Sequence, residues 1–325
     1  MPETAAVIGI DTSNYTTSVA LLDTEGRLLA NIKRPLPVKG GECGLRQSDA
    51  VFAHVKNLPS AMKEAEGILS GRPIAAVGVS TKPRNAEGSY MPCFLVGAAE
   101  AAGLQAALHV PTYAFSHQCG HIMAALDSAG REEHLTRTFG AFHVSGATTE
   151  VLRVTPDNDG FHTEVVGGGA DLHAGQLIDR VGVYMGMPFP AGRYMEEAAL
   201  KNKVRVSPRK PSVCGMTANL SGFENLAKAL YDDTGNMFLT SAFVLRAVSD
   251  TLVTLGERYI ATYGEMPIVF AGGVMSNSAI KAELARHFDA VFAEPAMSAD
   301  NAVGVAALAL RSYREGKDHG FIGTP

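Results

Sequence analysis

Residues 7–22 read VIGIDTSNYTTSVALL, and residues 141–154 read AFHVSGATTEVLRV. In each stretch a short apolar run leads into polar residues and then into a second run rich in β-branched and apolar residues, a pattern typical of a β-hairpin. The predicted strands are Val7–Ile10 and Thr17–Leu22 around the polar turn 11–16, and Ala141–Ser145 and Glu150–Val154 around the turn 145–149. The segments TTSVALL (16–22) and TTEVLRV (148–154) are offset by 132 residues, which indicates an internal duplication.

A second pair of buried-type strands supports the duplication. Ile74–Val79 ends in Ser80-Thr81, and Pro267–Ala271 ends in Gly272-Gly273. Helices are expected at Ser48–Leu69, Val96–Leu108, Ser221–Tyr231 and Thr240–Tyr263. Strands and helices that alternate in two similar halves predict an α/β fold. Two facing polar turns suit a nucleotide phosphate between the halves, although Gly and Thr are also ordinary turn residues.

Composition narrows the class of protein. The 325 residues correspond to about two domains. Hydrophobic residues make up 46% of the chain and charged residues 19%, which excludes a disordered chain, and a net charge of -5 excludes a generally basic nucleic-acid coat. The 4 Cys contain no CxxC pair, which argues against a disulfide framework and a four-thiolate zinc site. Without a recognisable signal peptide or an apolar stretch near ~20 residues, we expect a cytoplasmic protein that does not enter a membrane.

His117 and His121 stand at positions i and i+4 in SHQCGHIMAAL (116–126). On a helix they project from one face, as a two-imidazole metal site requires, and Ser116 is the expected N-cap. Metalloproteases of the HExxH type need a glutamate after the first histidine. Gln118 occupies that position and disfavours peptidase chemistry. Cys119 projects from another face of the helix and is not expected on the same metal.

Other polar residues each have a functional and a structural interpretation. His143 is unusual in an apolar strand, and it is either a hydrogen-bonded core residue or a ligand. Asp300 in SADNAVG (298–304) is either the N-cap of the following helix or a ligand. Asp179 and Asn277 suit hydrogen bonds to a ribose or a base, or ordinary turn and surface positions. The basic segment KNKVRVSPRK (201–210) is either a contact for nucleic-acid phosphates or a solvated loop.

Six ordered motifs together resemble the tRNA threonylcarbamoyl transferase family (TsaD-like proteins), formerly described as O-sialoglycoprotein endopeptidases. IGIDTS (8–13) is similar to the family's IGIETS, HQCGH (117–121) to HxEGH, and FHVSGATTEV (142–151) to VSGGHT. AGQLIDRVGVYMGMPFPAG (174–192) is similar to AGEAFDKVAxLLGLxYPGG, FAGGVMSN (270–277) to AGGVSAN, and SADNAVG to TDNGAMI. The resemblance covers nearly the whole chain.

The resemblance implies the actin/sugar-kinase/Hsp70 fold, with two RNase-H-like halves and a nucleotide cleft between them. We expect residues 1–110 in the first half, 111–305 in the second, and a C-terminal segment 306–325 that packs back on the first. The family's metal ligands map onto His117, His121 and Asp300, with His143 as a fourth ligand, and this mixed set suits iron or zinc. The contacts of an adenine nucleotide or acyl-adenylate map onto Ser145, Gly146, Asp179, Gly192, Glu196 and Asn277.

By the same resemblance, the activity is transfer of a threonylcarbamoyl group from an adenylate to a tRNA adenosine. The implied partners are tRNA and either a TsaB-like homologous protein or a second copy of the chain. The motifs identify no catalytic residue.

The chain also departs from the family pattern. Cys119 replaces the glutamate of HxEGH, SGATT replaces SGGHT, and KPRNAEGSYMPCF (82–94) stands where the family has its GPGL loop. Tyr15-Thr16 replaces an acidic pair, and Glu224 in ANLSGFEN (218–225) replaces a lysine. These departures keep a second hypothesis open, a catalytically silent paralogue that binds nucleotide and metal in a regulatory or scaffold role.

Overall fold

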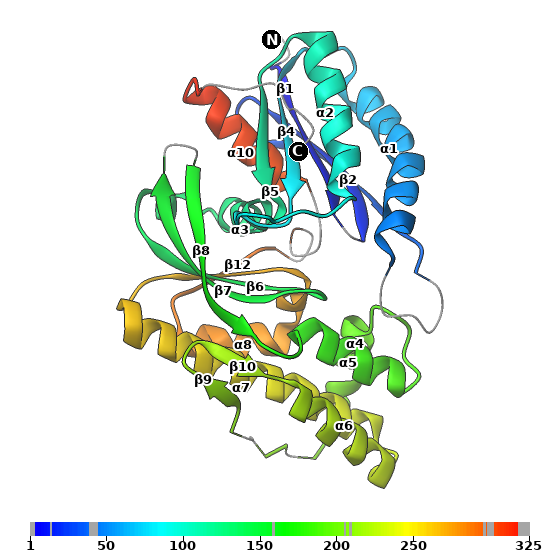
Figure 1. The fold of residues 1–325 in the computed structure, drawn as a ribbon, viewed down its shortest axis with the longest axis vertical. Helices are drawn as coiled ribbons and strands as arrows, with labels where there is room; N and C mark the ends of the chain where they lie inside the picture. Colours follow the sequence, from blue (N-terminus) through cyan, green and yellow to red (C-terminus); the bar gives the residue numbers. More distant parts are fainter. Residues whose placement is uncertain are drawn as a thin grey trace.

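The computed structural model describes residues 4–13, 15–38, 45–157, 160–204, 206–207, 210–294, 297 and 302–317. Two mixed β-sheets form the centres of two halves, drawn one above the other in Figure 1. Helix α3 (His117–Ser128) lies between the two sheets, and helix α10 (Val303–Arg314) packs against α3 and the first sheet. The residues of these two helices therefore belong to one apolar core shared by both halves.

The first sheet has five strands in the order β3-β2-β1-β4-β5. These strands are β1 (Ala6–Ser13), β2 (Thr16–Asp23), β3 (Leu28–Pro35), β4 (Ile74–Lys82) and β5 (Thr112–Ser116). β1 pairs antiparallel with β2 and parallel with β4. Alternate side chains of β1 therefore reach two different cores: Ile8 and Ile10 pack under α1 (Gln47–Leu69) and α2 (Phe94–Leu108), whereas Val7 packs toward α3 and α10.

The first hairpin is tighter than the sequence pattern predicted. Asp11, Thr12 and Ser13, which were expected in a wide turn, continue β1 and pair with Ser18, Thr17 and Thr16. Buried polar groups need hydrogen-bond partners, and the side chains of Asp11 and Thr12 have them. Thr12, for example, donates its hydroxyl to the carbonyl of Cys93 at 3.0 Å. Pairing therefore extends through the polar residues.

The second sheet has seven strands in the order β12-β11-β6-β7-β8-β10-β9. They are β6 (Phe139–Val144), β7 (Thr149–Asp157), β8 (Gly160–Gly169), β9 (Ser212–Cys214), β10 (Thr217–Asn219), β11 (Ile268–Ala271) and β12 (Ala290–Phe292). β6 pairs antiparallel with β7 and parallel with β11, as β1 does with β2 and β4. The two predicted hairpins thus occupy equivalent places in two separate sheets, as the duplication required.

Close helix contacts explain two glycines in the first sheet. A Cβ at Gly9 on β1 would lie 2.4 Å from the carbonyl oxygen of Ala302, and one at Gly78 on β4 would lie 2.6 Å from that of Val305. Glycine therefore lets α10 approach the strands directly. On the outer face of the second sheet, the core is formed with α4 (Ala174–Tyr184), α5 (Gly192–Ala199), α6 (Ser221–Thr234), α7 (Met237–Tyr263) and α8 (Ser278–His287).

Helix α7 is long and apolar enough to cross a membrane by length and composition, which the sequence pattern did not anticipate. It is the one such helix among the described residues. Of its most apolar window, 67% is buried inside the protein. Its apolar side chains, including Val244, Val248 and Leu252, belong to the core of the second half, as expected for the central helix of a packed domain.

The strand order also refines the division that we propose between the halves. Because β5 pairs with β4 in the first sheet, we place the boundary after Ser116 rather than after residue 110. α10 contacts β1, β2, β4 and β5, so we assign it to the first half. Residues 318–325, which end the expected C-terminal segment, lie outside the described residues.

Candidate metal and nucleotide site

The N-terminal part of α3 carries the two histidines of HQCGH. Ser116 is the N-cap, as predicted, and its hydroxyl accepts the backbone N–H of Cys119 at 3.2 Å. This cap starts the helix directly at His117, so that His121 lies one turn further on the same face. The Nε2 atoms of His117 and His121 are 3.0 Å apart.

His143 on β6 completes a cluster of three imidazoles. One ring nitrogen from each of His117, His121 and His143 lies within 4.8 Å of the others. His121 and His143 are each only 4% exposed. Three imidazole nitrogens that converge at one point are a donor set that fits zinc or iron. The remaining expected ligand, Asp300, lies outside the described residues.

Asp11 on β1 supports this cluster, and the sequence reasoning missed it. Its Oδ2 atom lies 2.9 Å from Nδ1 of His117, and its Oδ1 atom accepts the hydroxyl of Ser80 on β4. A carboxylate at Nδ1 holds the proton there and leaves Nε2 available as a ligand. The available signal was the position of Asp11 at the end of the first apolar run, within IGIDTS.

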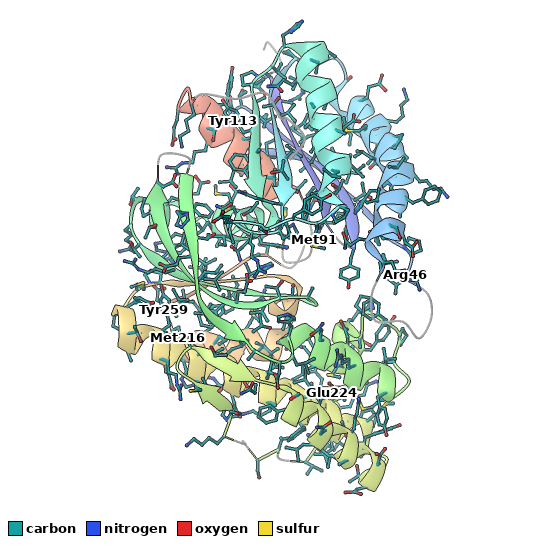
Figure 2. All side chains as sticks on the ribbon, in the orientation of Figure 1. Arg46, Met91, Tyr113, Met216, Glu224 and Tyr259 are labelled. Carbon is teal, nitrogen blue, oxygen red and sulfur yellow. The ribbon has the colours of Figure 1, made fainter. Side chains whose placement is uncertain are left out.

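A cavity of about 1130 Å³ lies beside the histidines. His117 and His143 form part of its wall, as do all six residues expected to contact the nucleotide: Ser145, Gly146, Asp179, Gly192, Glu196 and Asn277. The opposite wall comes from the first half and includes Tyr15, Tyr90 and Met91, the last of which is labelled in Figure 2. Residues far apart in the sequence thus meet at one cavity between the halves.

Three glycines in this cavity have no structural reason to be glycine. A Cβ at Gly192 or Gly273 would meet no atom within 4 Å, and one at Gly146 would meet only Oδ2 of Asp179, at 3.9 Å. None of the three has a positive φ angle. Because these glycines carry no side chain, the space beside the backbone stays open along this wall. A ligand can therefore approach the backbone closely there.

The turn after β6 is tightly built. Ser145 donates its N–H to the carbonyl of Thr148 at 2.8 Å, and its hydroxyl accepts the N–H of Ala147 at 3.3 Å. A Cβ at Gly175 would lie 2.3 Å from the carbonyl oxygen of Ser145, so glycine is needed there for the first turn of α4 to pack on this turn. The N-terminal end of an α-helix therefore points at the predicted phosphate position.

Asp179 on α4 is buried at the cavity wall. Its Oδ1 atom accepts the N–H of Ala191 at 2.7 Å. Burial raises the pKa of this carboxyl to about 6, although the hydrogen bond from Ala191 lowers it. Asp179 is therefore an ionised acceptor at neutral pH and becomes protonated in mildly acidic solution.

Glu196 and Asn277 both stabilise the start of α8 at the same wall. Oε1 of Glu196 accepts the backbone N–H of Ser278 at 2.8 Å and also its hydroxyl. Oδ1 of Asn277 caps α8 by accepting the N–H groups of Ala279 and Ile280, at 3.1 and 3.0 Å. Both side chains line the cavity, but each already has a structural role.

Cys119, which occupies the family's glutamate position, lies away from the cavity. Its side chain is buried in the shared core, and burial raises the pKa of its thiol to about 11. The neighbouring Gln118 is also buried and donates to Oε2 of Glu150 at 2.6 Å. Neither residue offers a base in the cavity, which agrees with the case against peptidase chemistry.

Comparison with known families gives one match over most of the chain. The family model for tRNA N6-adenosine threonylcarbamoyltransferase (TsaD) matches residues 44–307. This range contains the three histidines and every residue of the predicted nucleotide wall.

Comparison with solved structures identifies the fold. Full-length HypF in its phosphate- and nucleotide-bound form is 10% identical with a TM-score of 0.58, and the match covers 97% of this chain and 47% of HypF. Component A of the (R)-2-hydroxyglutaryl-CoA dehydratase of Acidaminococcus fermentans is 15% identical with a TM-score of 0.56, and the match covers 96% of this chain and 100% of that protein. The ROK hexokinase of Thermus thermophilus is 14% identical with a TM-score of 0.51, and the match covers 96% of this chain and 100% of the hexokinase. The chain thus spans about half of HypF and the whole of the other two, and these likenesses confirm the actin/sugar-kinase/Hsp70 fold alone.

Proposed function

Because this chain belongs to the tRNA N6-adenosine threonylcarbamoyltransferase (TsaD) family, we propose that it transfers a threonylcarbamoyl or related carbamoyl-type group from an acyl-adenylate to a tRNA adenosine. The observation that carries the proposal is one continuous cavity in which two of the three clustered histidines and the glycine-lined wall meet. A site of this kind can hold the nucleotide and the reacting carbonyl of one acyl-adenylate at the same time.

The balanced reaction is a simple acyl transfer. The N6 amine of the adenosine attacks the carbamoyl carbonyl carbon, the bond from that carbon to the phosphate oxygen breaks, AMP leaves, and the amine loses one proton. A divalent cation held by His117, His121 and His143 would supply Lewis-acid polarisation of the substrate oxygens. We assign the positioning of the ribose to Asp179 and the close approach of the phosphate to Gly146 and the first turn of α4.

The silent paralogue remains the second candidate because of one feature of the cavity. Its carboxylates already have donors within the protein: Glu150 is paired with Arg84, Glu196 accepts from Ser278, and Asp179 accepts from Ala191. An adenine amine is a weak nucleophile, and loss of a general base typically costs about 10²–10⁴-fold in rate. A protein that binds nucleotide and metal without turnover would tolerate this arrangement.

The decisive experiment is a transfer assay followed by mass spectrometry of the tRNA nucleosides. We expect the protein, loaded with iron or zinc and supplied with threonylcarbamoyl-adenylate, to modify unmodified tRNA. The His117→Ala/His121→Ala double variant should lose both the metal and the product. His162→Ala, which removes an exposed histidine of β8, should retain them.

The assay should be run with the chain alone, with a TsaB-like partner, and at concentrations that allow the chain to self-associate. We also propose a cytoplasmic location, in keeping with tRNA as the acceptor. Absence of the modified nucleoside in every combination, together with retained binding of metal and AMP, would replace the transferase by the silent paralogue.

A further inference from the structure

The segment that follows β4 brings a guanidinium into the cavity beside the histidines. Arg84 lines the cavity, its side chain is 50% exposed, and it forms an ion pair with Glu150 on β7. It lies within KPRNAEGSYMPCF, the stretch that stands in place of the family's GPGL loop. The family pattern therefore assigns no role to this arginine.

The backbone around Arg84 is held to the first turn of α3. The N–H of Gln118 donates to the carbonyl of Pro83 at 3.0 Å, and the amide of Asn85 donates to Sγ of Cys119 at 3.4 Å. The N–H of Arg84 itself donates to the hydroxyl of Ser89 at 3.2 Å. Two departures from the family, the new segment and Cys119, thus contact each other and place Arg84 next to the helix turn that carries His117.

Glu150 orients the guanidinium. Its other carboxylate oxygen accepts from Gln118, and Gln118 in turn accepts the hydroxyl of Thr163 at 3.1 Å. Glu150 also lies directly opposite His143 in the β6–β7 pairing. Arg84 is therefore fixed at the level of the histidines along this hairpin.

The same hairpin sets the distance from the predicted phosphate position. The Ser145-Gly146 turn begins two residues beyond His143 along the chain. At ~3.3 Å per residue, the turn and the His143–Glu150 level are about 7 Å apart. An acyl group that runs along the hairpin from a phosphate at this turn would pass the histidines and reach the level of Arg84.

Arg84 retains hydrogen-bonding capacity toward the cavity. A guanidinium has five N–H donors in a planar fork, which suits two-point binding of a carboxylate. Among the residues that the structure describes, the side chain of Arg84 has one hydrogen-bonding partner, Glu150. Burial lowers the pKa of His173 at the start of α4, and the positive charge of Arg84 lowers it further. His173 therefore tends to stay neutral, which leaves Arg84 as the positive charge of this pair.

We propose that Arg84 is a specificity residue that binds a carboxylate on the transferred acyl group, so that the protein selects acyl-adenylates whose acyl group is itself anionic. This inference rests on the proposed function, because it assumes that an acyl-adenylate occupies the cavity. The adenylate phosphate is the other anion that a guanidinium could bind, and the experiment separates the two.

The test is calorimetric binding of three probes: AMP, a non-hydrolysable threonylcarbamoyl-sulfamoyl adenosine with a free carboxylate, and the same compound with that carboxylate converted to the carboxamide. In Arg84→Gln we expect affinity for the carboxylate probe to fall about 10–100-fold, as for the loss of a charged hydrogen bond, with about 2-fold or smaller changes for the other two. The affinity of Arg84→Lys for the carboxylate probe should lie between those of the wild type and Arg84→Gln. Arg246→Gln, which breaks a similarly half-exposed arginine–aspartate pair outside the cavity, is the matched control and should bind all three as the wild type does.

Glu150→Gln separates recognition from a structural role. If Arg84 contacts the carboxylate, this variant should keep the preference for the carboxylate probe over the carboxamide, because the glutamine amide oxygen can still accept from the guanidinium and hold it in place. An equal loss for all three probes in Arg84→Gln, a selective loss of AMP, or a loss of the preference in Glu150→Gln would overturn the inference. Wild-type protein that binds none of the probes would overturn the proposed function itself, whereas binding of all three with no effect of Arg84→Gln would overturn only this inference.

Discussion

At the scale of single residues, the carboxyl groups around the cavity divide into two kinds. Asp11 uses both of its oxygens, for Ser80 and His117, whereas Glu196 and Asp179 each use one oxygen, for Ser278 and Ala191. Asp179 is also the carboxyl at the cavity wall whose pKa burial raises to about 6. The ionisation of Asp179 is therefore the property through which pH should act on nucleotide binding.

We predict that adenosine affinity falls as the pH decreases through 6, because protonated Asp179 loses its ability to accept from both ribose hydroxyls. With a pKa of about 6, only about a tenth of the carboxyl groups remain ionised at pH 5, so affinity should fall ~10-fold between pH 7.5 and 5. Asp179→Asn should bind more weakly at pH 7.5 and show a flat profile. Adenosine is the proper ligand for this calorimetry, since a phosphate monoester titrates near pH 6. An unchanged pH profile in Asp179→Asn would remove this residue from the site.

At the scale of elements, the contact between α3 and α10 positions the histidines. A Cβ at Gly304 on α10 would lie 1.8 Å from the carbonyl oxygen of Gly120 and 2.7 Å from the N atom of Ala124. Gly120 lies between His117 and His121 in the sequence. The separation of these two helices therefore helps to set where the imidazoles lie relative to β6.

We predict that Gly304→Ala destabilises the fold by about 3 kcal/mol, because α10 must move away from α3 and the first sheet. The same movement should weaken metal binding. Gly103→Ala, at an exposed position of α2 where a Cβ would meet nothing within 4 Å, is the control and should stabilise by about 0.5–1 kcal/mol. Urea denaturation followed by circular dichroism measures both. Equal stability of Gly304→Ala and the wild type would show that the helices adjust without cost.

The elements themselves were largely predictable, because apolar periodicity and β-branched runs act locally. The helices at 48–69 and 240–263 and the paired strands of both hairpins agree with the structure within a few residues. The extension of β1 through Asp11–Ser13 was not predictable, since it depends on partners such as Ser80 and Cys93 far along the chain. For the same reason the sequence indicated the histidines but not Asp11 or Arg84, whose meaning arises only when distant segments meet.

At the scale of the whole molecule, the histidine cluster joins the two halves. His143 belongs to the second sheet, His117 and His121 lie on α3 between the sheets, and Asp11 links His117 to the first sheet. A cation bound by these residues would therefore connect elements from both halves. Such a cation should stabilise the folded protein as a whole, because it binds an arrangement that the unfolded chain lacks.

We predict that Asp11→Asn weakens Zn²⁺ affinity about 10–100-fold while leaving the three histidines in place, since the asparagine amide orients Nδ1 of His117 poorly. Saturating Zn²⁺ should raise the unfolding temperature of the wild type in calorimetry. At equal free Zn²⁺ well above both dissociation constants, the increment in Asp11→Asn should be smaller by the equivalent of about 1.4–2.7 kcal/mol. Asp23→Asn is the matched control, because Asp23 is a fully buried aspartate of the same sheet that accepts the N–H groups of Glu25 and Arg27, each at 2.9 Å. Asp23→Asn should lower the stability of the metal-free protein and leave the Zn²⁺ increment intact. If Asp11→Asn instead showed the same Zn²⁺ increment as the wild type, the assignment of Asp11 to the metal centre would be wrong.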